Sequence, residues 1–145
     1  MPRFSPRLAI AALSCVALVL SAVLLLTAAG ASTRTRVVSD CVHPHYKPHR
    51  FIVACGDGSY YLIHLRWRHW GRHYAYATGT ARANDCTPSC AQGTFHSYAV
   101  RFKLTRRGHC AARNDLEYQH YSIHYPHRRP GSPPDSSRAV YAGCN

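Results

Sequence analysis

The side chains best suited to acid–base chemistry in this sequence are Glu117, His120 and Arg101. Glu117 is its only glutamate, and His120 follows three positions later. Cleavage of a phosphodiester needs a general base, a general acid and a cation that stabilises the developing charge. Neighbouring strands could bring these three groups together, with His124 and Arg113 as substitutes for the acid and the cation. Alternatively, Glu117 pairs with one of the many arginines and has no catalytic role.

Binding of polyanions is the second chemistry that the residue types favour. The chain has 18 Lys and Arg against 6 Asp and Glu, a formal net charge of +12 at pH 7. Cations attract polyanions over long range, and aromatic side chains can stack on bases or sugar rings. Tyrosines and tryptophans alternate with cations between residues 60 and 76. The predicted anion-binding residues are Arg66, Arg68, Arg72, Arg101, Lys103, Arg106 and Arg107. A basic surface without a specific ligand is the alternative.

Histidines form two groups, over residues 43–49 and 120–127. His43 and His45 are close enough in sequence to approach one ion, and imidazole suits zinc, copper or nickel. His120 and His124 would lie about 13 Å apart along one face of a strand, too far to share an ion. Exposed basic loops explain both groups more simply, so we predict neither a metal nor another cofactor.

The cysteines predict a disulfide framework. Of 7 cysteines, only Cys15 lies in the first 31 residues. The others are Cys41, Cys55, Cys86, Cys90, Cys110 and Cys144. An even number in a small exported domain is typical of disulfides, although six cysteines allow fifteen pairings. We predict Cys41–Cys55, Cys86–Cys90 and Cys110–Cys144. The spacing of Cys86 and Cys90 would also suit two zinc ligands, but thiols outside the cytoplasm tend to oxidise.

The first 31 residues have the order of an export signal. Arg3 and Arg7 form a positive start, and residues 8–26 form an uncharged, apolar run that favours a helix. Small residues follow, and we place signal-peptidase cleavage after Ala31. The run is also long enough to remain as a membrane anchor. Either way residues 32–145 are expected outside the cytoplasm, secreted or tethered, because the positive flank stays inside.

The rest of the chain favours short strands, and no window shows a convincing helical period. Alternation or β-favouring composition marks residues 51–55, 60–70, 73–80, 94–105 and 116–125. In the second segment it places Tyr61, Ile63, Leu65 and Trp67 on one face, and in the fourth it groups His96, Tyr98, Val100, Phe102 and Leu104. Turns or irregular loops are expected over 41–50, 82–93, 106–114 and 126–138. We predict an all-β domain over 41–145, a small disulfide-stapled antiparallel sandwich or barrel, after a polar linker over 32–40.

Several motifs occur together in a specific order. They are Ala54-Cys55-Gly56-Asp57-Gly58, Leu65-Arg66-Trp67 with Trp70-Gly71, Thr78-Gly79-Thr80, and Asn84-Asp85-Cys86-Thr87-Pro88-Ser89-Cys90-Ala91 followed by Gly93-Thr94-Phe95. This pattern, over about residues 41–125, resembles a group of small secreted proteins of actinobacteria, and 84–95 is its most specific part. The resemblance implies export and a disulfide-stabilised domain. Because these proteins have no established activity, the resemblance supplies no catalytic residues.

We therefore expect an exported basic domain that acts by binding. The expected partners are anionic envelope polymers or a membrane surface, with nucleic acid as a further candidate. The alternative is a small secreted hydrolase such as a ribonuclease, using the set around Glu117.

Overall fold

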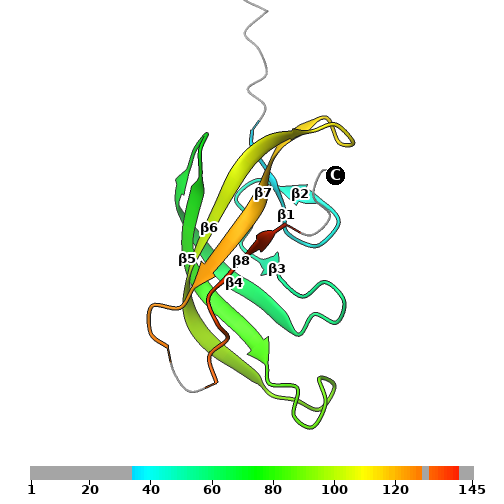
Figure 1. Cartoon of the computed structure of the whole chain (residues 1–145), viewed down its shortest axis with the longest axis vertical. Helices are drawn as coiled ribbons and strands as arrows, with labels where there is room; N and C mark the ends of the chain where they lie inside the picture. Colours follow the sequence, from blue (N-terminus) through cyan, green and yellow to red (C-terminus); the bar gives the residue numbers. More distant parts are fainter. Residues whose placement is uncertain (1–33, 129–130, 141–145) are drawn as a thin grey trace, which may run out of the picture. The chain divides into compact units, whose positions relative to one another are not determined.

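The computed structural model describes residues 34–128 and 131–140 (Figure 1). The described part contains strands and no α-helix, which confirms the predicted all-β class. Among these residues there is accordingly no helix able to cross a lipid bilayer. The predicted signal or anchor over residues 1–31, with its hydrophobic helix, lies outside the described residues.

Six antiparallel strands form the main sheet, and their order in the sheet, β3-β4-β5-β6-β7-β8, is also their order in the chain. Their bounds are Phe51–Ile52 (β3), Tyr60–Trp70 (β4), Ala75–Asn84 (β5), Phe95–Cys110 (β6), Asp115–His124 (β7) and Ser136–Ala139 (β8). A separate two-stranded sheet pairs β1 (Val37–Val38) with β2 (Pro44–His45). Since each strand of the main sheet pairs with the next, simple hairpin connections join them.

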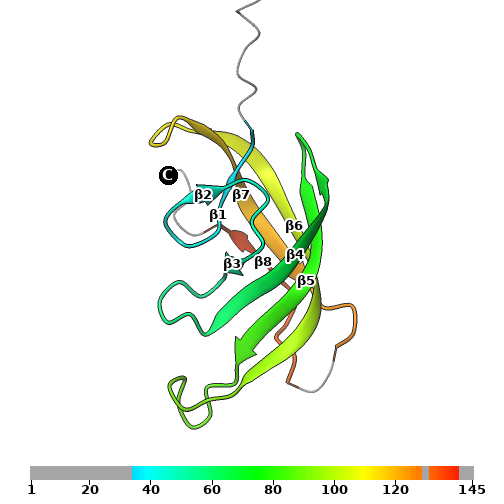
Figure 2. The same cartoon turned by 180° about the vertical axis from the view of Figure 1, so that it is seen from behind.

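The main sheet is strongly curled, so that its edge strands β3 and β8 lie near each other at its open side (Figures 1 and 2). Two register shifts in β4 contribute to the curl, one between Ile63 and Arg66 and one between Trp67 and His69. Extra residues of this kind bend a strand and increase its twist. The result is a curled antiparallel sheet that encloses an apolar core, within the predicted class of sandwich or barrel.

The first irregularity in β4 also shifts the predicted face of that strand. Leu62 and Leu65 are both 0% exposed, although simple alternation places them on opposite faces. His64, between them, has a φ of 54° and is exposed. Because the extra residue shifts the alternation by one position, the prediction that Tyr61 and Ile63 share a face with Leu65 and Trp67 is wrong.

Strand β6 follows its predicted alternation closely. The inward side chains of its first half are buried, and they are Tyr98, Val100, Phe102 and Leu104. His96, predicted on the same face, is exposed near the start of the strand. The strand also continues to Cys110, where a turn was predicted. The prediction therefore identified the core positions better than the end of the strand.

The polar linker predicted over residues 32–40 is wrong for the described part of that segment. Val37 and Val38 form β1 and are 0% and 3% exposed. Arg36 bridges β7 in parallel, because its N–H donates to Leu116 O (2.8 Å) and its carbonyl accepts from Tyr118 N (2.9 Å). Val37 and Val38, both β-branched, thus belong to the core, although the polar residues around them favoured a linker.

Two further short strands lie where loops were predicted. β2 lies within 41–50, and β8 begins within the proline-rich segment 126–138 and ends at Ala139. β8 pairs with β7 through its cross-strand neighbours, from Ile123 opposite Ser136 to His120 opposite Ala139. Serine and proline give weak strand signals, so only the pairing partner reveals these elements.

Two of the three predicted disulfides are confirmed. Cys41–Cys55 and Cys86–Cys90 have S–S distances of 1.93 and 2.06 Å. Cys110 is fully buried and disulfide-bonded, while Cys144, its predicted partner, lies outside the described residues. Disulfides indicate that the domain matures in an oxidising environment.

Candidate anion-binding surface

The structure does not assemble the predicted catalytic set around Glu117. This side chain is buried in the domain, with the residue 1% exposed. Its two carboxylate oxygens accept hydrogen bonds from Arg113, at 2.7 Å from Nε and 2.9 Å from Nη2. These bonds raise the pKa of the Arg113 guanidinium. A buried carboxylate held in this way stabilises the domain and is not available to a substrate.

Arg101 is also distant from Glu117 along the sheet, whereas His120 lies opposite Thr105, three positions along β7 from Glu117. Glu117 lies opposite Gly108, whereas Arg101 lies opposite His124 at the far end of β7. Positions 117 and 124 are separated by roughly 24 Å of extended strand. General acid–base catalysis needs groups within hydrogen-bond reach of one substrate, so this alternative loses its geometric basis.

A row of cross-strand neighbours on the outer face of the sheet carries the basic residues instead. Arg66 on β4 lies opposite Thr78 on β5, and Thr78 lies opposite Arg101 on β6. The inward positions beside the row, Ala77 and Phe102, are both 0% exposed, so the row itself faces outward. Strands lie about 4.8 Å apart, which places the two arginine Cα atoms roughly 10 Å apart on either side of Thr78.

The next row adds a lysine beside an aromatic ring. Lys103 lies opposite Tyr76, and its Nζ lies 5.2 Å from the ring centroid of Tyr74. The rings of Tyr74 and His69 lie 4.3 Å apart, and Tyr74 is 41% exposed. We call this surface the outer basic face, and it consists of Arg66, His69, Tyr74, Thr78, Arg101 and Lys103. It combines cations with an accessible aromatic ring, the pair of groups that polyanion binding uses.

Carboxylates do not neutralise the outer basic face. All six acidic residues lie in the described ranges, and each has a local partner. The pairs are Asp40 with His43, Asp57 with the Ser59 amide, Asp85 with His96, Asp115 with Arg36, Glu117 with Arg113, and Asp135 with His124. Within the described part of the chain, Arg66, Arg101 and Lys103 therefore form no ion pair.

The remaining predicted cations differ in their surroundings. Arg68, Arg72 and Arg106 are exposed outside the two rows. Arg107 is half-buried, and its Nε donates to Thr35 Oγ1 at 2.7 Å, so it supports the N-terminal segment. The φ of 55° at Arg106 breaks the alternation that would have placed Arg107 with Arg101 and Lys103.

A shallow hollow on the same face was not predicted. It has a volume of about 320 Å³, and the residues that line it are His64, Arg66, Thr78, Gly79 and Thr80. It lies beside the extra residue at His64 and beside Gly79, where β4 and β5 approach closely. A Cβ at Gly79 would point to the interior and lie 2.9 Å from Ile63 O and from Leu65 Cδ2, so this close approach requires the glycine. Neither feature shows from alternation alone, because the register between β4 and β5 determines which residues meet.

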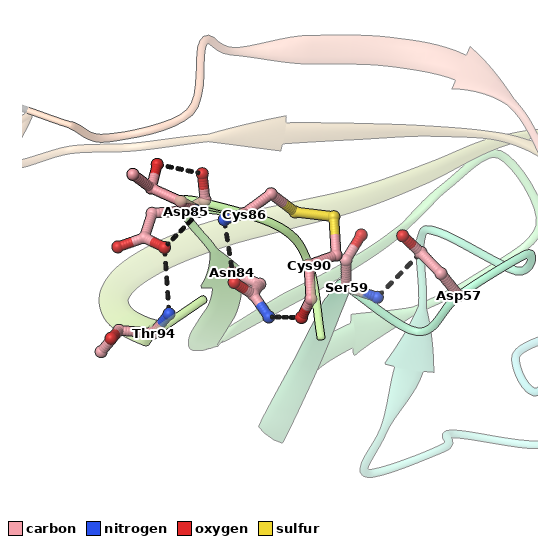
Figure 3. Close-up of a disulfide and its surroundings, with 8 residues drawn as sticks. Asp57, Ser59, Asn84, Asp85, Cys86, Cys90 and Thr94 are labelled. Atoms are coloured by element: carbon pink, nitrogen blue, oxygen red, sulfur yellow. Dashed lines mark hydrogen bonds between the residues drawn. A yellow bond between two sulfur atoms is a disulfide. The ribbon is translucent and has the colours of Figure 1, made fainter. Parts of the chain in front are cut away.

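The loop with the most specific sequence motif uses its polar side chains for its own structure (Figure 3). Asp85 Oδ1 accepts hydrogen bonds from Thr94 N (2.9 Å) and Thr87 N (3.1 Å), and Oδ2 lies 3.0 Å from His96 Nε2. These bonds, together with the Cys86–Cys90 disulfide, fix the loop between β5 and β6. The motif therefore has a structural explanation.

Asn84 and Gly93 complete this loop. The Asn84 side chain donates to Cys90 O (2.8 Å) and accepts from Cys86 N (2.9 Å). A Cβ at Gly93 would lie 2.7 Å from Cys86 N, closer than real Cβ contacts allow. The glycine is therefore needed so that the chain can pass next to the asparagine.

Asp85 makes the loop sensitive to acid. Hydrogen bonds from His96 and from the Thr94 and Thr87 amides lower the pKa of Asp85 from 3.8 to about 2. Because the folded pKa is below the unfolded one, this stabilisation is complete above about pH 4 and is lost as the pH falls towards 2. We expect the amides of Thr87 and Thr94 to lose protection over this range, measured by NMR as exchange rates relative to the intrinsic rates of unfolded chains at the same pH.

Two variants test the origin of that pH dependence. Asp85→Asn should abolish the pH dependence of amide protection at Thr87 and Thr94. His96→Gln should retain part of this pH dependence, because both amide hydrogen bonds to Asp85 remain. An Asp85→Asn protein with the wild-type pH dependence at Thr87 and Thr94 would contradict this explanation.

The histidines of residues 43–49 cluster around a carboxylate. Asp40 Oδ2 lies 3.1 Å from His43 Nδ1 and 4.0 Å from His45 Nε2. The Asp40 pKa is lowered to about 2, since amide bonds from His43 and Val42 outweigh the opposing effect of burial. Over the described residues, no three ligating side chains are placed to hold one metal ion.

The fold and this surface define a class: a small disulfide-bonded antiparallel β domain with a basic outer face. No protein-family model, curated protein or solved structure matches the chain. A function for it therefore has to be argued from the geometry of the described residues.

Proposed function

We propose that this protein is exported and binds anionic polymers of the cell envelope through the outer basic face. The observation that carries the proposal is the placement of Arg66 and Arg101 on either side of Thr78, on a face without a neutralising carboxylate. A basic charge that was only needed for solubility would not require two cations in one cross-strand row. The proposal is one of binding, not of catalysis.

Three features support export. The positive, apolar and small-residue order of residues 1–31 is that of a secretory signal or anchor. Disulfides at Cys41–Cys55 and Cys86–Cys90 favour an oxidising compartment. The motif order over 41–125 resembles small secreted proteins of actinobacteria. Outside the cell, phosphate- and carboxylate-bearing envelope polymers are abundant ligands for a basic face.

The expected binding mode is electrostatic with an aromatic component. The two arginines would each contact an anionic group of one polymer segment, and Lys103 would add a third contact beside the Tyr74 ring. Each neutralised phosphate releases counterions, so affinity falls as salt rises. A membrane surface or nucleic acid would meet the same cations, and comparison of the probes distinguishes these partners.

Retention on immobilised poly(glycerol phosphate) tests the proposal. We expect Arg66→Gln with Arg101→Gln to bind about thirtyfold more weakly, since each of the two lost contacts with an anionic surface contributes about 1 kcal/mol. The slope of log affinity against log salt concentration should also become less steep by about 1.5, or roughly 0.7 for each lost contact. Phosphatidylserine vesicles and single-stranded RNA serve as competitors.

A matched control keeps the change in net charge constant. Arg34 and Lys47 also flank an aromatic ring, at 5.3 and 5.4 Å from the Tyr46 centroid, but they lie on the N-terminal segment. Arg34→Gln with Lys47→Gln should reduce retention much less. Equal losses in both double variants would mean that only net charge matters. Retention independent of salt, or preferential binding of RNA, would overturn the proposal.

A further inference from the structure

The open side of the curled sheet contains a second candidate site, between the edge strands β3 and β8. Two hollows of about 170 and 200 Å³ lie there. They share the lining residues Val53, Tyr121 and Arg138, so they form neighbouring parts of one recess. We call this recess the seam. None of the residues of the outer basic face lines it.

Two polar side chains of β8 point into the seam. Arg138 lies opposite Tyr121, and Ser136 lies opposite Ile123, in the register of β7 with β8. Tyr121 and Ile123 are 4% and 1% exposed, so both face the interior. Directly opposite residues of a pair of strands share a face, so Ser136 and Arg138 lie on the side of β8 that faces the seam. Ser136 is half-buried, whereas Arg138 lines both hollows and remains exposed. Both line the 200 Å³ hollow.

Ser136 lacks a hydrogen-bond partner where one is expected, and Arg138 is an exposed cation beside it. The hydroxyl of Ser136 is buried and forms no hydrogen bond within the described structure. Buried hydroxyls are nearly always hydrogen-bonded, so an unpaired one needs an explanation. Arg138 likewise forms no ion pair with any described residue. A cation and an unpaired donor at one position form a receptor for an anion.

The walls of the seam are aromatic and apolar. Tyr60 and Tyr125 hydrogen-bond to each other through their hydroxyls, and burial raises the pKa of both. Burial also raises the pKa of Tyr121, against the opposing charge of Arg138. The three phenols thus stay neutral and add no competing negative charge to the seam. Val53 and Pro133 complete an apolar lining.

The size of the hollows limits the ligand. A cavity of about 150 Å³ accommodates a benzene ring, and each hollow slightly exceeds that volume. A ligand body of one ring or a short branched chain therefore fits either hollow.

We infer that the seam binds a small monoanion, a carboxylate on a compact apolar body, with the carboxylate on Arg138 and Ser136 and the body against Val53 and Tyr121. This site is independent of the outer basic face. It is also independent of the proposed polymer binding, because the two use different residues on different faces of the sheet.

Titration with benzoate tests this inference, followed by NMR and calorimetry on the exported protein. Saturable shifts are expected at Val53, Tyr121 and Ser136. Arg138→Gln should weaken binding about tenfold or more, the loss expected for one charge-assisted hydrogen bond. Lys47→Gln, which removes one exposed cation elsewhere, should leave the affinity unchanged.

Ser136→Ala separates ligand binding from a structural role. Since its hydroxyl has no partner in the described structure, its removal should leave the free energy of unfolding unchanged or slightly higher. It should nevertheless weaken benzoate binding several-fold. If Ser136 served only the fold, Ser136→Ala would lower the free energy of unfolding and leave the affinity for benzoate unchanged.

Neutral and small probes provide the remaining comparisons. Benzamide should bind much more weakly than benzoate, because it lacks the charge, and acetate should bind more weakly, because it lacks the ring. No saturable binding of benzoate, equal binding of benzamide, or equal affinity of Arg138→Gln would each overturn the inference. Arg138→Gln should retain polymer binding, so failure here is distinguishable from failure of the proposed function.

Discussion

Glu117→Gln is expected to lower the free energy of unfolding by about 3 kcal/mol. Glu117 is 1% exposed, and its carboxylate is held by two hydrogen bonds from Arg113. Glutamine keeps the size of the side chain but removes the charge that accepts both hydrogen bonds from the Arg113 guanidinium. Breaking a buried ion pair on one side is costly, because the polar groups that remain are no longer matched. Urea unfolding monitored by tryptophan fluorescence measures the change.

An exposed ion pair provides the control for Glu117→Gln. Asp115 is bound to Arg36 at 3.3 Å, and these side chains are 23% and 46% exposed. Asp115→Asn should cost less than about 1 kcal/mol, as for other surface pairs. If Glu117→Gln were as stable as Asp115→Asn, the structural role assigned to the buried pair would be wrong. RNA cleavage that depended on Glu117 in a fully folded variant would restore the hydrolase alternative.

Replacement of Cys41 and Cys55 by serine is expected to destabilise the domain by about 3 kcal/mol. The bridge closes a sequence separation of 14 residues, and it joins the N-terminal segment to the turn before β4. That segment carries Val37 and Val38, which complete the core. Loss of the bridge should therefore increase amide exchange at both valines, in addition to lowering the free energy of unfolding.

The second described disulfide gives a direct comparison. Cys86–Cys90 has a sequence separation of only 4, so its removal relaxes a much shorter loop. The loop-entropy relation predicts a loss of about 2 kcal/mol for Cys86→Ser with Cys90→Ser. Exchange should increase at Thr87 and Thr94 and remain unchanged at Val37. A larger loss of stability on removal of Cys86–Cys90 than on removal of Cys41–Cys55 would contradict this explanation.

The strands that were predicted most accurately are those with uninterrupted alternation. From Tyr98 to Leu104, β6 keeps one inward side chain at every second position, so the core residues follow directly from the sequence. β4 breaks this pattern at His64, where a single extra residue exchanges the two faces. Composition does not reveal a bulge, because its position depends on the partner strand. β8 was missed for a related reason, since only its pairing with β7 makes Ser136–Ala139 a strand.

The cations of the outer basic face, Arg66, Arg101 and Lys103, could be named from the sequence, but their arrangement could not. Arg66 and Arg101 are distant in the chain and meet only through Thr78, in a register that the bulge in β4 helps to determine. Arg107 had the same sequence signal and yet faces Thr35. The seam could not be predicted from the sequence, because Arg138 and Ser136 lie in a segment that was predicted to be an irregular loop.

The shortness of the edge strands has a consequence for association between molecules. β3 has two residues and β8 has four, whereas β5 and β6 have a neighbour along both edges. The outer edges of β4 and β7 are covered only in part, by β3 at Tyr61 and Leu62 and by β8 at residues 120–123. The N-terminal segment adds further backbone bonds, from His49 to Leu65 and from Arg36 to Leu116 and Tyr118. An incoming strand from another copy would find few free backbone groups to extend the sheet. We therefore expect this domain to resist edge-to-edge aggregation and fibril growth at high concentration, although its core strands are rich in tyrosine and β-branched residues.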